Sequence, residues 1–259
     1  MRTIVFSFCV FSYAILHAVQ FTWDGAGSDN NWMTGGNWAG DAAPANDGTA
    51  TLIFAGASAT TAQNDYPAGT AFTGITLTNT AAFTLAGNAI TLAGPLNSAA
   101  NTGTAFRDTI NLPIELAADT AVTLGASHHL TINGAISGAF RLTKTNSGGE
   151  LTLNGLNTYT GPTTTAGGRV FFNTIADIGY ACSFGAPTTP EAATIRVEGS
   201  LEYTGGNAST DRDFFFVNDQ QFSVNGPGNL TLNGGIGGPR APLFRGGRDI
   251  IINGPVTNT

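Results

Sequence analysis

Short stretches in which aliphatic residues alternate with threonine or other residues recur along the chain, and each ends in Asn-Gly. Residues 130–134, 151–155 and 230–234 have nearly the same sequence, and residues 250–254 are a fourth variant. An alternation with period two predicts a strand that is apolar on one face. Asn and Gly tolerate the backbone of a tight corner, so we expect each strand to end in a turn.

The spacing of these stretches predicts a solenoid. Asn133, Asn154 and Asn173 follow one another at intervals of about 20 residues, as do Asn233 and Asn253. A period of about 20 residues is typical of coils that bury their apolar faces by stacking on one another. The alternative, an antiparallel sandwich, does not need strands of similar sequence. The expected fold is therefore an all-β parallel β-helix.

A longer repeat is also present. Leu130 and Leu230 stand in similar surroundings, and an aspartate precedes each of them by about one coil period, Asp108 and Asp211 respectively. This similarity predicts that several coils form a larger unit that has been duplicated.

Composition agrees with an all-β chain and argues against some partners. The 259 residues include 35 Gly and 11 Pro, and only 10% are charged, which disfavours helices. An apolar fraction of 42% is too high for a disordered chain. The formal charge is −7 and Lys144 is the only lysine, so we expect no nucleic acid or anionic membrane partner.

Residues 1–18 have the pattern of a signal peptide. Met1 and Arg2 precede an apolar run over residues 4–16, and Ala18 suits a cleavage site. The run is too short to cross a bilayer, and no later stretch approaches the roughly 20 apolar residues of a transmembrane helix. After cleavage Cys182 is the only cysteine, so no intramolecular disulfide is expected.

The segment after the leader holds all three tryptophans close together in the sequence: Trp23, Trp32 and Trp38. One interpretation is an N-terminal cap, residues 19–60, which covers the open end of the core. The other is a glycan or Ca²⁺ site, with exposed indole rings beside polar side chains. The polar residues concerned are Asp24, Asp29, Asn30 and Asn31. Their spacing matches no complete calcium loop, so the cap is favoured, and the tryptophans stay candidate glycan contacts.

A second candidate surface is basic. Arg240, Arg245 and Arg248, separated by glycine pairs, form the most basic cluster of the chain. They are candidate contacts for an anionic glycan, and the alternative is a solvated loop between coils.

Catalytic and metal chemistry are not expected. Glu198, Glu202 and Arg196 come nearest to the carboxylate cluster of a polysaccharide enzyme, although residues one coil apart can also meet in space. The adjacent His128 and His129 point to opposite faces of a strand, so they cannot share one metal ion. The prediction is no catalytic residue, no metal ligand and no cofactor.

Residues 142–165 read LTKTNSGGELTLNGLNTYTGPTTT. This stretch, to about residue 170, resembles the autotransporter-associated β-strand repeat, most specifically at Asn157-Thr158-Tyr159-Thr160-Gly161 and Thr163. The tryptophan-rich start is similar to the N-terminal region of large exported bacterial proteins with such repeats. Glu150, the shifted pair Gly148-Gly149, and Thr165 depart from the pattern.

The resemblance implies a right-handed β-helical passenger, secreted or displayed on the bacterial surface. Passengers of this family include adhesins, and the repeat itself is a scaffold rather than a site of chemistry. We expect β-helix repeats over residues 61–259, incomplete at the C-terminal end. The expected function is structural or adhesive, as a monomer that contacts surface glycans or other cells. The alternative is a polysaccharide-active enzyme or glycan-binding module on the same scaffold.

Overall fold

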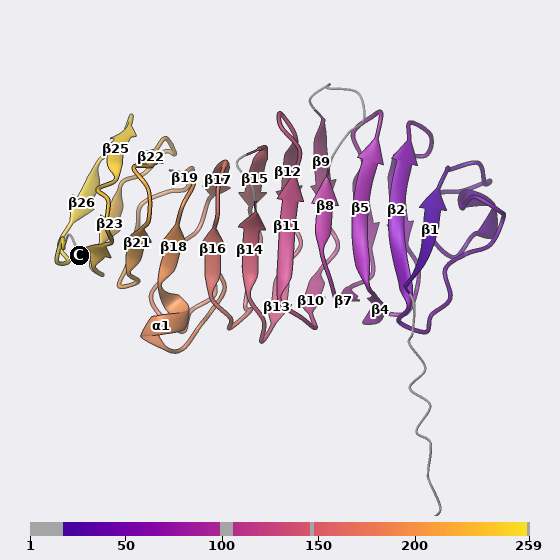
Figure 1. The fold of residues 1–259 in the computed structure, drawn as a ribbon, viewed down its shortest axis with the longest axis horizontal. Helices are drawn as coiled ribbons and strands as arrows, with labels where there is room; N and C mark the ends of the chain where they lie inside the picture. Colours follow the sequence, from indigo (N-terminus) through magenta and orange to yellow (C-terminus); the bar gives the residue numbers. More distant parts are fainter. Residues whose placement is uncertain (1–17, 99–105, 146–147, 258–259) are drawn as a thin grey trace, which may run out of the picture.

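The computed structural model describes residues 18–98, 106–145 and 148–257. Of the predicted signal peptide, residues 1–18, only Ala18 is among the described residues. The described chain forms a solenoid of stacked parallel strands, with the N-terminal coils at one end of the long axis and the C-terminal coils at the other (Figure 1). The predicted all-β parallel β-helix is therefore confirmed. Among the described residues, no helix is long and apolar enough to cross a membrane.

Over the described residues, two long sheets run the length of the solenoid. Sheet A has ten strands: β1 (Val19–Trp23), β2 (Ala50–Gly56), β5 (Gly74–Asn79), β8 (Leu96–Ser98), β11 (Thr120–Leu124), β14 (Leu142–Thr145), β16 (Thr163–Thr165), β18 (Ile195–Val197), β21 (Phe214–Phe216) and β24 (Ile236–Gly237). Sheet B has nine: β3 (Thr61–Asn64), β6 (Thr84–Gly87), β9 (Arg107–Ile110), β12 (His129–Ile132), β15 (Glu150–Leu153), β17 (Arg169–Phe172), β19 (Ser200–Tyr203), β22 (Gln221–Val224) and β25 (Leu243–Gly246).

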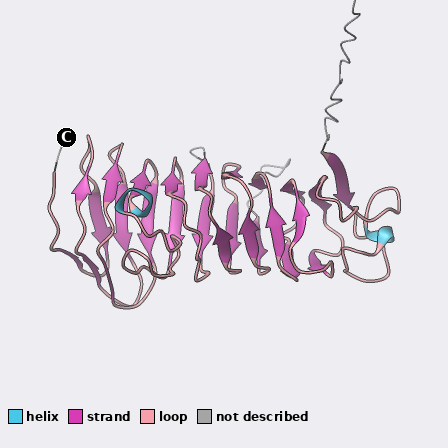
Figure 2. Cartoon of the chain, turned by 90° about the horizontal axis from the view of Figure 1, so that it is seen from below, coloured by secondary structure: helices cyan, strands magenta, loops and turns pink. Residues whose placement is uncertain are grey.

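The third side of the solenoid is divided between two short sheets. Sheet C holds β4 (Thr70–Phe72), β7 (Ile90–Leu92), β10 (Ile114–Leu116) and β13 (Ile136–Gly138). Sheet D holds β20 (Ala208–Thr210), β23 (Leu230–Leu232) and β26 (Ile250–Ile252). Between them, residues 154–162 and 173–194 take the place of a third strand. The short helix α1 (Pro190–Ala193) lies in the second of these segments, and Figure 2 shows it from below.

The core forms because the strands of neighbouring coils pair in a register that places aliphatic side chains on top of one another. Leu130 and Ile132 of β12 pair with Leu151 and Leu153 of β15, and all four are buried. The intervening residues point outward and are partly exposed. Alternation along each strand thus buries one apolar row after another, as the pattern predicts.

Asparagines at the corner after sheet B form a ladder. Asn133 Nδ2 donates to Asn111 Oδ1 at 2.9 Å, and Asn154 Nδ2 donates to Asn133 Oδ1 at 3.0 Å. At the corner after sheet D, Asn253 Nδ2 donates to Asn233 Oδ1 at 2.9 Å. The turns predicted after the Asn-Gly stretches are confirmed.

The predicted duplication of a larger unit does not correspond to a structural repeat. Leu130 lies in β12 of sheet B, whereas Leu230 lies in β23 of sheet D. The reason is that the coils differ in length. Thr120 pairs with Leu142 on the next coil, whereas Thr165 pairs with Val197, which is farther along the chain. The separation of the two leucines is therefore not a whole number of coils, and the two similar stretches stand on different sides.

Candidate functional site

The three tryptophans predicted as candidate glycan contacts lie inside the molecule. Trp23, Trp32 and Trp38 are each 0% exposed. The Trp23 and Trp38 rings meet edge to face, with centroids 5.2 Å apart, and all three pack on Phe54 of β2. The indole faces are not available to a sugar, so the glycan-contact interpretation of these residues is wrong. Their rings instead belong to the apolar core next to β1, the end strand of sheet A, and the cap over residues 19–60 stays a prediction.

The polar residues of the same segment order its turns. The Asp29 carboxylate accepts hydrogen bonds from the Asn31 backbone N–H at 2.9 Å, from the Thr34 hydroxyl at 3.0 Å and from Asn37 Nδ2 at 3.2 Å. The first two bonds lower the pKa of Asp29 because they favour the charged carboxylate. Asp24 accepts in the same way from the Ala26 N–H. These oxygens are engaged within the loop.

The basic cluster is exposed at the C-terminal end of the solenoid. Arg245 lies in β25, Arg248 lies in the following turn, and Arg240 lies before the strand; all three side chains are exposed. Arg245 and Arg248 share a shallow depression of about 270 Å³, which Arg240 does not line. Within the part of the chain that the structure describes, none of the three forms an ion pair. This surface can therefore attract an anionic ligand.

The histidine pair is arranged as predicted. His128 is buried at 3% exposure, and His129 in β12 points outward. His129 Nδ1 lies 2.7 Å from Glu150 Oε2, on the next coil. The two imidazoles thus face opposite sides of the strand. Among the described residues, no three or more His, Cys, Asp or Glu side chains lie together as a metal ion would require.

His129 belongs to a network of charges on the outer face of sheet B. Arg169 Nη1 lies 3.8 Å from Glu150 Oε1 and 3.6 Å from Glu202 Oε2, and Asn225 Nδ2 donates to Glu202 Oε1 at 3.0 Å. A shallow depression of about 300 Å³ lies over part of this row. The residues that line it are Ser127, His129, Gly149, Glu150, Gly168, Arg169 and Ser200. Each carboxylate already has a positive or polar partner.

Glu198, Glu202 and Arg196 came nearest to a carboxylate cluster in the sequence. In the structure they belong to two separate networks. Arg196 Nε donates to Glu198 Oε1 at 2.7 Å, whereas Glu202 belongs to the sheet B row. The row itself was missed because its members are far apart in sequence. The coil period could have revealed this row, because His129, Glu150 and Arg169 follow one another at steps of about 20 residues. One coil per step places them side by side.

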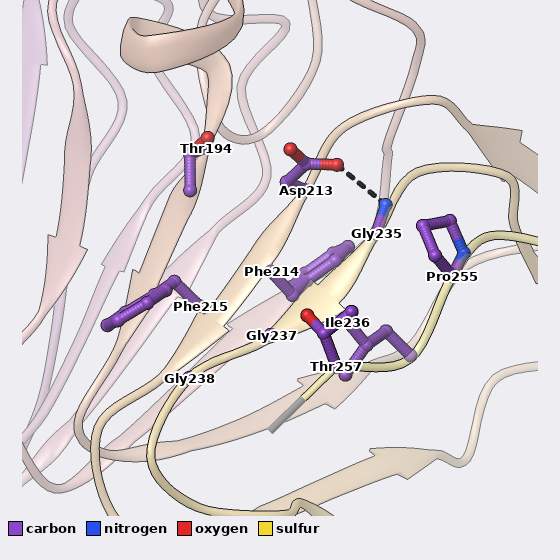
Figure 3. Close-up of a pocket in the computed structure, with 10 residues that line it drawn as sticks. All are labelled: Thr194, Asp213, Phe214, Phe215, Gly235, Ile236, Gly237, Gly238, Pro255 and Thr257. Atoms are coloured by element: carbon purple, nitrogen blue, oxygen red, sulfur yellow. Dashed lines mark hydrogen bonds between the residues drawn. The ribbon is translucent and has the colours of Figure 1, made fainter. Parts of the chain in front are cut away.

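Further shallow depressions follow the outer face of sheet A. One, of about 350 Å³, lies over β21 and β24 (Figure 3). A second, of about 290 Å³, lies beside it, and both are lined by Thr194 and Phe215. The binding chemistry available to the chain is thus spread over open sheet faces.

Stacked coils around one apolar core place the chain in the class of β-solenoids. The chain is 38% identical over 114 residues, 42% of its length, to the adhesin BmaC autotransporter of Brucella suis biovar 1 (strain 1330). The aligned region covers 3% of that protein. No protein-family model and no solved structure matches the chain. The similarity and the fold confirm the predicted resemblance to autotransporter passengers.

Proposed function

We propose that the chain is part of an exported bacterial surface or secreted protein whose solenoid has a structural and adhesive role. The observation that carries this proposal is the stacked parallel solenoid in a chain similar to an autotransporter adhesin. A solenoid exposes long, rigid lateral faces, because each coil contacts only its neighbours and leaves its outer residues in solvent. Such faces suit contact with other cells.

The basic cluster is the proposed contact for anionic glycans. Arg240, Arg245 and Arg248 present exposed guanidinium groups, which bind carboxylates and sulfates through paired hydrogen bonds. Because the whole chain carries a charge of −7, the attraction is local and is screened by salt. The acting species is proposed to be a monomer at the cell exterior.

Adhesion of the purified chain to cultured cells tests the proposal. Beads coated with the chain should bind cells more than beads coated with heat-unfolded chain. Reversing charge in Arg240→Glu, Arg245→Glu and Arg248→Glu together should lower binding to immobilised heparin and remove its salt dependence. Charge reversal at the exposed Arg107, on the same outer sheet, is the matched control. Equal cell binding by folded and unfolded chain would contradict the adhesive role.

A role without catalysis is also proposed, because each glutamate of the sheet B network is paired. Pectins, xylans, alginate and sulfated glycans incubated with the chain should release no reducing ends or unsaturated products. Turnover that disappears in Glu198→Gln or Glu202→Gln, but remains in Glu115→Gln, would establish the polysaccharide-active alternative.

A further inference from the structure

Strand β21 presents an aromatic ring on the outer face of sheet A. Phe214 and Phe216 point into the core and are buried, whereas Phe215 between them points outward and is partly exposed. Figure 3 shows the Phe215 side chain projecting away from its strand. A ring on a rigid sheet offers a flat apolar face in a fixed position.

The two faces of this ring have different neighbours. On the β18 side, Arg196 is in register with Phe215, and its Cζ lies 5.7 Å from the ring centroid. On the β24 side the residue in register is Gly237, which has no side chain. The ring face turned to β24 is therefore bordered by a gap in the row of outward side chains.

Thr257 borders the gap on its far side. Beyond β24, Val256 pairs with Ile236, which places Thr257 two strands away from Phe215. Neighbouring strands are about 4.8 Å apart, so the two side chains are separated by roughly 10 Å. Carbon atoms in van der Waals contact lie about 3.5 to 4.0 Å apart, so a flat ring stacked on Phe215 needs roughly 7 to 8 Å and fits within this separation.

Polar groups surround the gap, which lies within the depression of about 350 Å³ in Figure 3. The Asp213 carboxylate accepts a hydrogen bond from the Gly235 N–H at 2.6 Å. The Thr194 hydroxyl donates to the Pro190 carbonyl at 2.9 Å and retains acceptor capacity. Thr257 Oγ1 lies 3.3 Å from the position that a Cβ would take at Gly237. The site thus combines an apolar wall with hydroxyl and carboxylate groups at its rim.

We propose that this slot binds one neutral pyranose ring of a glycan, stacked on Phe215 and hydrogen-bonded to Asp213 and Thr257. A pyranose has C–H groups on its faces and hydroxyls around its rim, which matches this division of apolar and polar groups. Arg196 is already paired with Glu198, so the slot offers no unpaired cation for an acidic sugar. Sugar binding in the slot would serve the proposed adhesive function and rests on it in that respect. The slot residues are separate from Arg240, Arg245 and Arg248.

Saturation-transfer NMR on the whole chain tests the slot with three probes at millimolar concentration: methyl β-D-galactopyranoside, methyl β-D-glucopyranoside and methyl α-D-mannopyranoside. At least one should show transfer to its ring C–H protons and shift the amide signals of Gly235 and Gly237. Phe215→Ala should weaken this binding about tenfold, because the stacking face is lost. Gly237→Val should abolish it, because the new side chain fills the slot and suits a strand.

Phe171→Ala is the matched control. Phe171 of β17 also points outward under an arginine, with Arg169 Cζ 5.6 Å from its ring centroid. Its neighbours in register, Thr152 and Glu202, both carry side chains, so no slot lies beside it. This variant should bind as the parent does. Absence of transfer with all three probes, or unchanged transfer in Gly237→Val, would overturn the slot, whereas failure of bead adhesion alone would count against the adhesive function.

Discussion

The coils before β15 and the segment that follows them are built in different ways. In the former, strands of sheets A, B and C succeed one another, and Thr120 pairs with Leu142 on the very next coil. In the latter, residues 154–162 and 173–194 form no strand on the third side. Apolar stacking supports the regular coils, so the irregular segment needs another source of stability.

Specific polar contacts supply that stability. The Asn157 side chain accepts from the Ile136 N–H at 2.8 Å and donates to the Ser183 carbonyl at 2.8 Å, so it links β13 to the later loop. Tyr159 is buried, and its hydroxyl lies 2.6 Å from that of Thr163. The most specific part of the repeat motif is therefore a structural connection that covers the edge of β13.

A buried arginine orders the second irregular segment. Arg212 is 0% exposed, and its guanidinium donates to the carbonyls of Ala176, Tyr180, Phe184 and Gly185 at 2.9 to 3.1 Å. A single side chain thus satisfies four carbonyls of one loop. The comparison teaches that this solenoid tolerates the loss of a strand where polar groups are paired one by one.

The largest effect is expected where a charge enters the stacked core. Leu153→Asp places a carboxylate at a position that is 1% exposed, and should lower the free energy of unfolding by about 4 kcal/mol. Chemical denaturation followed by circular dichroism measures the change. Thr152→Asp, on the outer side of the same strand, should stay within about 0.5 kcal/mol of the parent. Equal effects of the two changes would contradict the core position of Leu153.

A smaller and more local effect is expected for Arg212→Met. The free energy of unfolding should fall by about 3 kcal/mol, because four carbonyls lose their donor and the bonds to two of them, at Phe184 and Gly185, are buried. Residues 174–189 should then be cleaved by protease and exchange amide hydrogens faster, while sheet C keeps its protection. Arg141→Met, at an exposed arginine, is the control. Loss of protection in sheet C to the same degree would show that the two regions are not independent.

The pH dependence of stability should reveal Lys144. Burial lowers the pKa of this amine to about 8, from 10.5 in an unfolded chain. Between pH 8 and pH 10 the folded chain loses this proton and the unfolded chain keeps it, so the free energy of unfolding should rise by about 2 kcal/mol. Above pH 10, Tyr66 and Tyr203 oppose this trend. Burial raises their pKa values, so the folded chain keeps these protons after the unfolded chain has lost them.

Lys144→Met should remove the rise between pH 8 and pH 10, as measured by denaturation at each pH. A flat profile in the parent chain, or the same rise in the variant, would contradict this assignment.

The smallest expected effect concerns the asparagine ladder. Asn133 both donates to Asn111 and accepts from Asn154, so Asn133→Ala should destabilise the regular coils by about 1 kcal/mol. Thr131→Ala, on the outer side of the same strand, should have less effect. Thermal unfolding of the two variants side by side distinguishes them, and an equal loss would show that the ladder adds nothing to the corner.

The sequence by itself determined the strands, their corners and their inner faces. A local alternation of residues sets which side of a strand is apolar, and Asn-Gly sets where it ends, so Leu151, Leu153 and the Asn133 ladder followed from neighbouring residues. The same period also determines the sheet B network, because His129, Glu150 and Arg169 stand on successive coils. Local patterns suffice for these features because every coil repeats the same geometry.

Only the tertiary structure decided which surfaces are available. Coil lengths vary with loop length, so the side on which Leu230 lies, and the neighbour that Phe215 meets at Gly237, depend on the sum of all preceding turns. Burial of Trp23 and of Arg212 likewise depends on segments distant in sequence, Phe54 for one and residues 176–185 for the other. Whether an aromatic or charged side chain faces a ligand or the core is set by these distant contacts, which composition and spacing do not encode.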